Sequence, residues 1–184
     1  MTFNLKDDGF TIVENLLTEE QLSQREALNY KGEFREDKAK FYGMSKYSDI
    51  DFPLEINNLI KDKAKEFTGQ TYDIFMKKMY YKAAYFGSCE YYHQDYFYRQ
   101  KLGVSNSKYL QCFIAVEDLD HAPLNVFVGS HKGSLHNHQM VLERDGNAKY
   151  SILNMKDIWS GDNFKSLKLK KGDAVFFDYM LVHG

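Results

Sequence analysis

The second half of the chain is divided into short apolar and aromatic runs by glycine and aspartate, and this feature restricts the fold more than any other. From Thr71 onward the runs are YDIFMKKMYYKAAYFG, YLQCFIAVEDL, LNVFVGS and SLKLKKGDAVFFDYMLVHG. In the last run leucine and lysine alternate over residues 167–170, and Gly172 and Asp173 separate them from AVFFDY, as the turn of a β-hairpin would. Runs of this kind predict β-strands.

Two helix signals precede these runs. After a strand-like stretch at residues 10–13, Thr18 and Gln21 have the spacing of a capping box, which predicts a helix over about residues 19–29. In the segment 52–69, FPLEINNLIKDKAKEFTG, apolar residues share one face at helical spacing between a proline and a glycine, which predicts a second helix.

The order of these signals indicates the fold class. Because helices come first and strands follow, we expect one mostly β (α+β) domain over residues 1–184, with the helices outside an antiparallel sheet or barrel. This order argues against alternating βαβ units. The polar, irregular region from Gly133 to Asn163 predicts a long loop or lid.

Composition narrows the partners and the compartment. With 24 Lys and Arg against 26 Asp and Glu, the net charge is -2, so we expect no nucleic acid and no membrane as partner. No apolar run approaches the roughly 20 residues of a spanning helix, and MTFNLKDDGF lacks the features of a signal peptide, which predicts a cytoplasmic protein. Of the two cysteines, Cys112 lies in an apolar run and is expected to be a reduced, buried thiol. The sequence does not indicate an oligomeric state.

The stretch YYHQDYFYRQ holds a histidine and an aspartate two residues apart, His93 and Asp95. In a strand, residues i and i+2 point to the same side, so both side chains could contact one ion while Gln94 points away. Imidazole with carboxylate suits Fe(II), Mn or Zn, and a second histidine would complete the facial triad of non-heme iron oxygenases. Taken alone, the pair is more typical of an exposed loop.

Five other histidines compete for the third position. His136 and His138 are flanked by polar residues typical of a solvated loop, and His121 precedes Pro123 in a turn-like segment. His183 ends the apolar run AVFFDYMLVHG, where burial of an unpartnered cation would be costly. Either a ligand role or a neutral core histidine bonded to the backbone explains it.

Four ordered blocks resemble the phytanoyl-CoA dioxygenase family, a branch of the Fe(II)- and 2-oxoglutarate-dependent oxygenases that also includes ectoine hydroxylase. DGFTIVENLLTEEQL is similar to the family's opening strand and helix, and HQD to its proximal metal motif. FIAVEDLDHAPLNVFVGSHK is similar to its strand, turn and Gly-Ser-His segment, and LKLKKGDAVFFDYMLVHG to the strand pair that carries the distal histidine. The resemblance covers most of the chain.

This resemblance implies a fold and a chemistry. The fold is a double-stranded β-helix (jelly roll, cupin-like) with the two helices bracing one sheet, and His93, Asp95 and His183 are its catalytic iron ligands. Fe(II) is the implied cofactor and 2-oxoglutarate and O2 the cosubstrates, for hydroxylation of an unactivated C–H bond of a small molecule with release of succinate and CO2. Halogenating members carry Ala or Gly in place of Asp95, so the carboxylate implies a hydroxylase rather than a halogenase.

The chain departs from the family pattern in two places. His121 and Ala122 stand where the family usually has a pair such as Asn-Gly. The family's serine and arginine that hold the distal carboxylate of 2-oxoglutarate follow the distal histidine, and the sequence ends at Gly184. Either the chain is C-terminally incomplete or the cosubstrate is held differently. We favour the incomplete domain, because a barrel that ends at its metal ligand leaves an open sheet edge.

Further candidates flank the metal motif. Lys82 and Gln111, on the predicted strands before and after it, are candidates for 2-oxoglutarate contacts, although a solvent-facing lysine and a sheet-surface glutamine are equally expected. The candidates for the substrate pocket are Tyr92, Tyr96, Tyr98 and Arg99. They form either a rim that fits a small polar or carboxylated molecule or an aromatic strand face with an exposed arginine.

A function of a different class is a non-catalytic jelly-roll binding module, or an inactive fragment, with a structural metal or none. The combination of His93, Asp95 and His183 favours the enzyme, whereas the missing family arginine favours the module. A fold and stability indifferent to His93→Ala and Asp95→Ala would support the module.

Overall fold

The computed structural model describes residues 3–23, 45–49, 52–82, 90–103, 108–142, 148–159 and 161–184. Two compact units form, one from Met1–Leu16 with Glu90–Gly184 and the other from Leu17–Cys89. Every strand pair in the described residues is antiparallel, which confirms a mostly β architecture with few helices.

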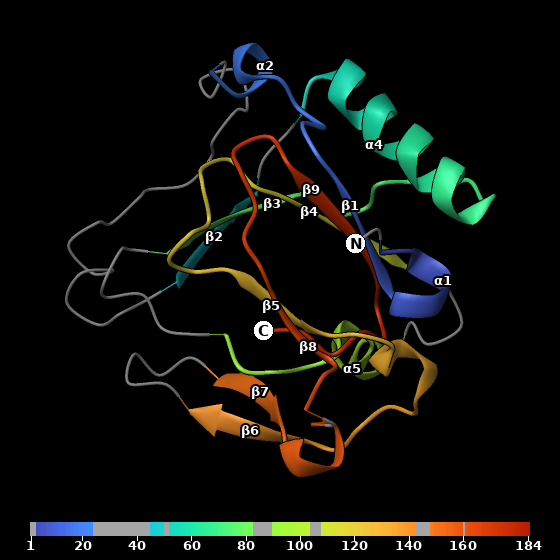
Figure 1. Cartoon of the computed structure of the whole chain (residues 1–184), viewed down its shortest axis with the longest axis vertical. Coiled ribbons are helices and arrows are strands. Elements are labelled where there is room, and N and C mark those ends of the chain that lie inside the picture. Colours follow the sequence, from blue (N-terminus) through green and yellow to red (C-terminus); the bar gives the residue numbers. More distant parts are fainter. Residues whose placement is uncertain are drawn as a thin grey trace. The chain divides into compact units, whose positions relative to one another are not determined.

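The first unit contains a three-stranded sheet in the order β1-β9-β4 (Figure 1). Its strands are β1 (Phe10–Val13), β9 (Ala174–Asp178) and β4 (Leu110–Ile114). The β1 bounds confirm the strand predicted at these positions. Residues 174–177 are all buried, because β9 has a partner strand on each side and is covered on both faces. This explains why its sequence is continuously apolar instead of alternating.

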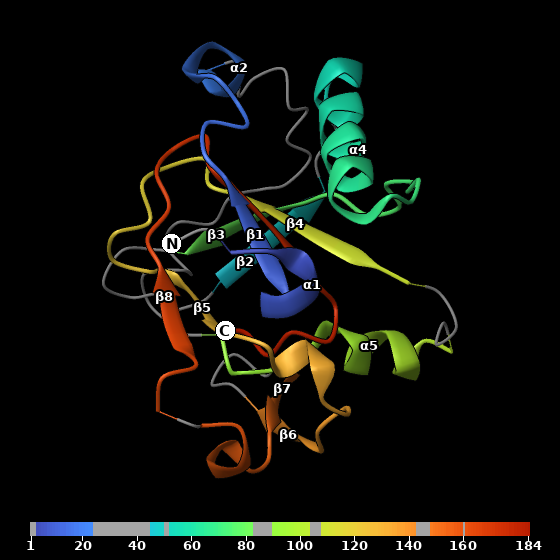
Figure 2. The same cartoon turned by 45° about the vertical axis from the view of Figure 1, so that its right-hand side comes forward.

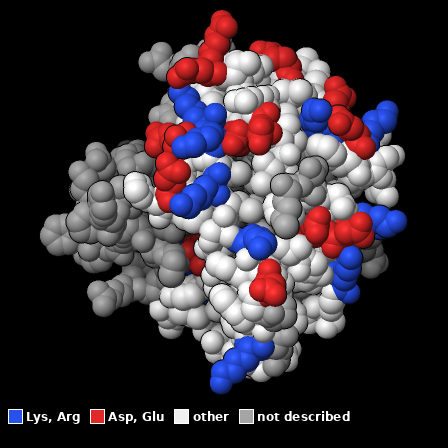
Figure 3. Space-filling view, viewed as in Figure 1, with Lys and Arg blue, Asp and Glu red and all other residues white. Residues whose placement is uncertain are grey.

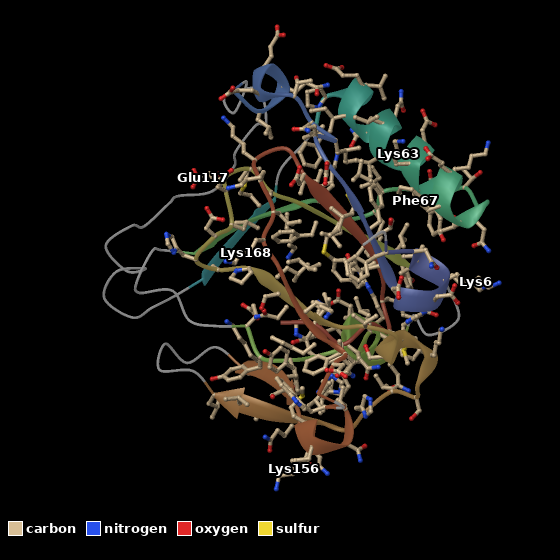
Figure 4. The ribbon with its side chains drawn as sticks, viewed as in Figure 1. Lys6, Lys63, Phe67, Glu117, Lys156 and Lys168 are labelled. Atoms are coloured by element: carbon tan, nitrogen blue, oxygen red, sulfur yellow. The ribbon has the colours of Figure 1, made fainter. Side chains whose placement is uncertain are left out.

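The hairpin predicted across Gly172 and Asp173 is wrong. β8 (Phe164–Leu167) pairs with β5 (Leu124–Phe127), whereas β9 pairs with β1 and β4. The turn itself is present, since Gly172 has a φ of 95° and the Asp173 N–H donates to the Lys170 carbonyl at 2.9 Å. The alternation was also correct for its own segment: the leucines are buried, and Lys168, labelled in Figure 4, is exposed.

Main-chain hydrogen bonds extend the β5–β8 pair into a larger layer. The extending bonds run from Phe127 N to Val182 O (3.0 Å), between Asn125 and Gly184 in both directions (2.9 and 3.0 Å), and from Ile152 N to Tyr92 O (2.9 Å). With the bridge between residues 93 and 183, the order becomes β8, β5, residues 182–184, residues 92–93 and β7 (Ala148–Ile152). The segment that ends in His183 therefore lies in the middle of this layer.

The region 133–163 is not the irregular loop that its polarity predicted. β6 (His138–Leu142) and β7 (Ala148–Ile152) form an antiparallel pair, and a short 3-10 helix, η3 (Met155–Asp157), follows. Another 3-10 helix, η2 (Ser130–Lys132), precedes the pair. Aromatic contacts with a neighbouring helix supply burial that the strands' own polar composition does not reveal.

The main core of the first unit lies between the two layers. It combines side chains of β1 and β9 with side chains of β5 and β8, and these include Phe10, Val126, Leu167, Val175 and Phe177. Two helices complete the unit, α1 (Leu5–Asp8) and α5 (Asp95–Lys101). α5 lies next to the β6–β7 hairpin (Figure 2), where Phe97 stacks on His138 with ring centroids 4.2 Å apart.

The second unit contains the two predicted helices. α2 (Glu19–Ser23) begins with the predicted capping box, in which the Thr18 N–H donates to Gln21 Oε1 at 2.9 Å and the Gln21 N–H to Thr18 Oγ1 at 3.2 Å. The rest of the predicted helix, to residue 29, lies outside the described residues.

α4 (Leu54–Thr68) confirms the second predicted helix. It ends at Gly69, which has a φ of 69° and whose N–H donates to the Lys65 carbonyl at 2.8 Å. Lys63 and Phe67 lie on this helix (Figure 4). The unit's strands, β2 (Ser45–Asp49) and β3 (Lys78–Lys82), pair with each other.

The described surface carries both signs of charge. In the face drawn in Figure 3, lysine and arginine are interspersed with aspartate and glutamate. None of the described helices has the length and apolar character needed to span a bilayer.

Candidate metal centre

An isolated antiparallel bridge joins His93 to His183. The His93 N–H donates to the His183 carbonyl at 2.9 Å, and the His183 N–H donates to the His93 carbonyl at 3.1 Å. Directly opposed residues in an antiparallel pair carry their side chains on the same face. The two imidazoles therefore lie together, with ring centroids 4.4 Å apart.

The same local contact orients both rings. Nδ1 of His93 lies 2.6 Å from the carbonyl oxygen of Tyr91, and Nδ1 of His183 lies 2.9 Å from that of Leu181. A carbonyl oxygen can only accept, so each Nδ1 carries the proton and each Nε2 keeps a lone pair when the ring is neutral. A histidine held in this way presents Nε2 as a ligand atom.

Asp95 reaches the two rings from the first turn of α5, not from a strand. The strand predicted for this motif is wrong, because His93 occupies the isolated bridge, Gln94 is the N-cap residue and Asp95 begins the helix. A carboxylate in the first turn is also favoured by the unpaired N–H groups of a helix start. The i, i+2 spacing still brings both side chains to one point, through a change of backbone conformation.

The three side chains form one compact donor set. Asp95 Oδ1 lies 3.5 Å from His93 Nε2, and Asp95 Oδ2 lies 3.7 Å from His183 Nε2. One ligand atom from each residue lies within 4.8 Å of the other two. Among the residues that the structure describes, this is the group in which three histidine, cysteine, aspartate or glutamate side chains lie this close together. The side chains are 12%, 22% and 8% exposed for His93, Asp95 and His183.

The protonation states suit a cation. Burial opposes charge on Asp95, but the charge of His183 and the hydrogen bond and charge of His93 outweigh it and lower the pKa of Asp95 to about 2. Burial and the neighbouring His93 lower the pKa of His183 to about 4. Burial also acts to lower the pKa of His93, but the hydrogen bond and charge of Asp95 raise it above 6.5. The partly buried carboxylate thus attracts positive charge to the cluster, and a metal ion would supply it.

Gln111 contacts the carboxylate of this set. From β4, its Nε2 donates to Asp95 Oδ2 at 2.6 Å, which fixes the orientation of the carboxylate. Its predicted contact with 2-oxoglutarate stays a prediction. Lys82 is the last residue of β3, as its predicted strand position required, and its side chain lies outside the described residues.

The four predicted substrate residues lie in different surroundings. Tyr98 meets His93 edge to face with centroids 5.6 Å apart, and burial together with nearby carboxylates raises the pKa of Tyr98 to about 12. Tyr92 packs against Phe127 in a separate apolar cluster. Tyr96 contacts Tyr179, and Arg99 lies over Tyr109. Three of the four come from α5, so the predicted aromatic strand face is wrong.

His138 is not a solvated loop residue, which corrects that prediction. Its Nε2 accepts the N–H of Gln94 at 3.1 Å, and its Nδ1 donates to the His136 carbonyl at 2.8 Å. Burial, with the charges of His93 and His136, lowers the pKa of His138, so the ring is neutral and can accept. His121, in contrast, is exposed as its turn position predicted.

Two residues near the centre were missed from the sequence. Gln94, named only as pointing away, is fully buried with both ends of its amide bonded. Ser130 Oγ accepts the N–H of Val182 at 2.9 Å, beside His183. The Gly-Ser-His segment and the middle position of the HQD motif were the available signals, and neither by itself identifies these partners.

Two imidazoles and one carboxylate on one side of a β-layer are the donor set of non-heme iron oxygenases. The family profile described as Phytanoyl-CoA dioxygenase (PhyH) matches residues 5–184. The chain belongs to this family. Membership confirms the predicted class, a 2-oxoglutarate-dependent non-heme iron oxygenase, with Fe(II), 2-oxoglutarate and O2 as cofactor and cosubstrates. No curated protein matches the chain.

Solved structures share the fold at low sequence identity. EvdO2 from Micromonospora carbonacea var. aurantiaca superposes with a TM-score of 0.69 at 15% identity, over 98% of this chain and 80% of that one. The epimerase SnoN, in complex with Fe3+, alpha ketoglutarate and nogalamycin RO, gives 0.66 at 16% identity, over 98% and 73%. HygX from Streptomyces hygroscopicus, with nickel, 2-oxoglutarate and hygromycin B bound, gives 0.58 at 12%, over 98% and 77%.

Proposed function

We propose that the protein hydroxylates an unactivated C–H bond of a small molecule and that His93, Asp95 and His183 bind its Fe(II). The observation that carries the proposal is the His93–His183 bridge, which brings two Nε2 atoms to the Asp95 carboxylate at 3.5 and 3.7 Å. When bound, Fe(II) would couple the oxidative decarboxylation of 2-oxoglutarate by O2, which yields succinate and CO2, to oxidation of the substrate.

The chain's own residues hold and orient this centre. The Tyr91 and Leu181 carbonyls keep the Nδ1 protons of the two histidines, so that both Nε2 atoms remain available. Gln111 holds one oxygen of Asp95 and leaves the other toward His93. The carboxylate at position 95 supports hydroxylation over halogenation, because halogenating members of the family that this chain resembles have Ala or Gly at that position.

The substrate is proposed to be a small molecule. HygX and SnoN have hygromycin B and nogalamycin RO in their structures, respectively, and this protein has their fold. Tyr98 is the predicted substrate residue whose position supports that role best, because its ring borders His93. We further propose that residues 1–184 form one jelly-roll domain. The family match over residues 5–184 and the two antiparallel layers of the first unit support this.

The test is an anaerobic titration with Fe(II) and then 2-oxoglutarate, followed through the weak visible charge-transfer band of a chelated keto acid. The proposal expects the band in the wild type and in His121→Ala, a control histidine that is exposed. It expects loss of the band in His93→Ala and His183→Ala. Absence of iron binding in the wild type would contradict the metal centre and support the non-catalytic module. Iron binding without the band would contradict only the cosubstrate part.

A further inference from the structure

The residue that separates the proposed iron ligands His93 and Asp95 in the sequence has a fully buried polar side chain. Gln94 is 0% exposed, whereas glutamine is mostly a surface residue. Burial of an amide is costly unless every polar atom finds a partner, so the contacts of this side chain need an explanation.

All of the hydrogen-bonding groups of the Gln94 amide are used. Nε2 donates to the Met180 carbonyl at 2.9 Å and to the Ser134 carbonyl at 3.4 Å, and Oε1 accepts the N–H of His136 at 2.8 Å. Two carbonyls on one side and one N–H on the other also decide which end of the amide is nitrogen. Apolar side chains of the same size could make none of these bonds.

The segment 134–138 is bound a second time through the main chain. The Gln94 N–H donates to His138 Nε2 at 3.1 Å, and the His138 ring stacks on Phe97 of α5 at 4.2 Å between centroids. Gln94 therefore holds the segment before β6 by its side chain and His138, the first residue of β6, by its backbone N–H.

The third attachment is to the segment that leads to the other histidine. Met180 belongs to the turn after β9, and the chain continues from it directly to His183. The turn is supported from within, since Asp178 Oδ1 accepts the N–H of Met180 at 2.7 Å. Asp178 thus holds the N–H of Met180 and Gln94 holds its carbonyl, so a shift of the Gln94 amide would move the turn that leads to His183.

We propose that Gln94 is a positioning residue that sets the distance between the His93–Asp95 motif and the turn leading to His183. It also ties the segment 134–138 to the metal centre. This inference rests on the proposed iron site. The physical reason for this role is that the buried Gln94 amide bonds to the backbone of two remote segments, at Met180 and at His136. Gln94 itself joins the proposed ligands on either side of it in the sequence.

The test compares metal affinity with fold stability. Gln94→Leu and Gln94→Met keep the approximate volume and remove all three side-chain bonds. Gln139→Leu makes the same chemical change at an exposed position of β6 and serves as the control. Co(II) binding is measured anaerobically by its ligand-field absorption, at a temperature where the metal-free variant is fully folded by circular dichroism.

The expected result is a Co(II) affinity lower by about 10- to 100-fold in the Gln94 variants, as is usual when residues that orient metal ligands are lost. We also expect a shifted absorption band, and wild-type values for Gln139→Leu. A residue that only fills space would lower the thermal midpoint and leave the affinity and band of the folded protein unchanged. That outcome would overturn the inference.

A second variant decides the matter if the Gln94 variants do not fold. His138→Phe keeps a ring on Phe97 and removes the acceptor of the Gln94 N–H. We expect weaker Co(II) binding in the same direction, and wild-type affinity would overturn the inference. The wild type and His93→Ala separate this from the proposed function: if the wild type binds no metal, the iron site itself is refuted. If the wild type binds Co(II), His93→Ala does not, and the Gln94 and His138 variants bind it with wild-type affinity, the positioning role alone is refuted.

Discussion

His93 and His183 are equivalent partners across one antiparallel bridge, and each donates its Nδ1 proton to the carbonyl two residues before it, at 2.6 and 2.9 Å. The equivalence means that a single backbone pairing brings the rings together and a repeated local contact orients them. The centre therefore depends on the pairing of two segments that are remote in sequence, and on the few side chains that hold those segments and Asp95 in place.

Replacing Gln111 with leucine should separate two roles for this residue. Loss of its 2.6 Å bond to Asp95 frees the carboxylate, so Fe(II) or Co(II) affinity should fall by about 10- to 100-fold. Gln100→Leu, at an exposed position of α5, is the control. If metal affinity stays at the wild-type value and only the 2-oxoglutarate dissociation constant rises, the predicted cosubstrate contact is correct and the Asp95 contact is unimportant. Isothermal titration with metal and then cosubstrate measures both.

Asp173→Ala should destabilise the fold. This buried carboxylate accepts the N–H of Asn15 at 3.0 Å and of Lys170 at 2.8 Å, which fixes the turn before β9. Loss of two charge-assisted bonds should lower the free energy of unfolding by about 2–4 kcal/mol. Asp120→Ala removes a 3.5 Å contact with Lys170 between exposed groups and should change it by less than about 0.5 kcal/mol. Urea unfolding followed by fluorescence gives both values, and equal effects would refute the assignment.

Asp178→Asn should change how stability depends on pH. Burial raises the pKa of Asp178 above 3.8, although the Met180 N–H, His131 and Lys108 act in the opposite direction. The folded state therefore binds the Asp178 proton more tightly than the unfolded chain does. The stabilisation that this protonation gives the folded state is lost as pH rises through the folded pKa.

The asparagine keeps an acceptor for Met180 and does not ionise. Relative to the wild type, its free energy of unfolding should increase between about pH 4 and pH 7. Urea unfolding at several pH values measures this difference, in which other titrating groups cancel. A difference that stays constant with pH would show that Asp178 has no raised pKa.

Cys112 should resist thiol reagents while the protein is folded. Burial raises the pKa of this free thiol on β4 to about 12, so at pH 8 the thiol is almost entirely protonated and unreactive. In a Cys89→Ser background, labelling with a disulfide reagent should be slow in buffer and fast in concentrated urea. Equal rates in the two conditions would contradict the burial of this thiol.

Local sequence signals predicted elements whose hydrogen bonds close within a few residues. The capping box at Thr18 and Gln21 and the helix between Pro53 and Gly69 are present, because side chains and caps in the same few turns decide them. The proposed metal centre was only partly predictable from its residues. His93 and Asp95 alone were more typical of an exposed loop, and His183 was equally compatible with a core histidine, so only the resemblance to the family joined the three residues that the structure brings together.

Pairing partners were not readable in the same way. The turn at Gly172 was predicted correctly, yet β8 and β9 belong to different layers, because β9 finds two remote partners instead of the strand before it. An aromatic strand face was one of two interpretations of the stretch after His93, which is helix α5 and packs on β6 and β7.

The sequence by itself determined the helix signals, the β-rich second half and the residue types at the proposed ligand positions 93, 95 and 183. Only the tertiary structure decided that β9 is central, that Gln111 binds Asp95 and that Gln94 reaches Met180. The physical reason is range. Capping and periodicity act between residues a few positions apart, whereas the orientation of a metal ligand depends on side chains that only long-range strand pairing brings within hydrogen-bonding distance.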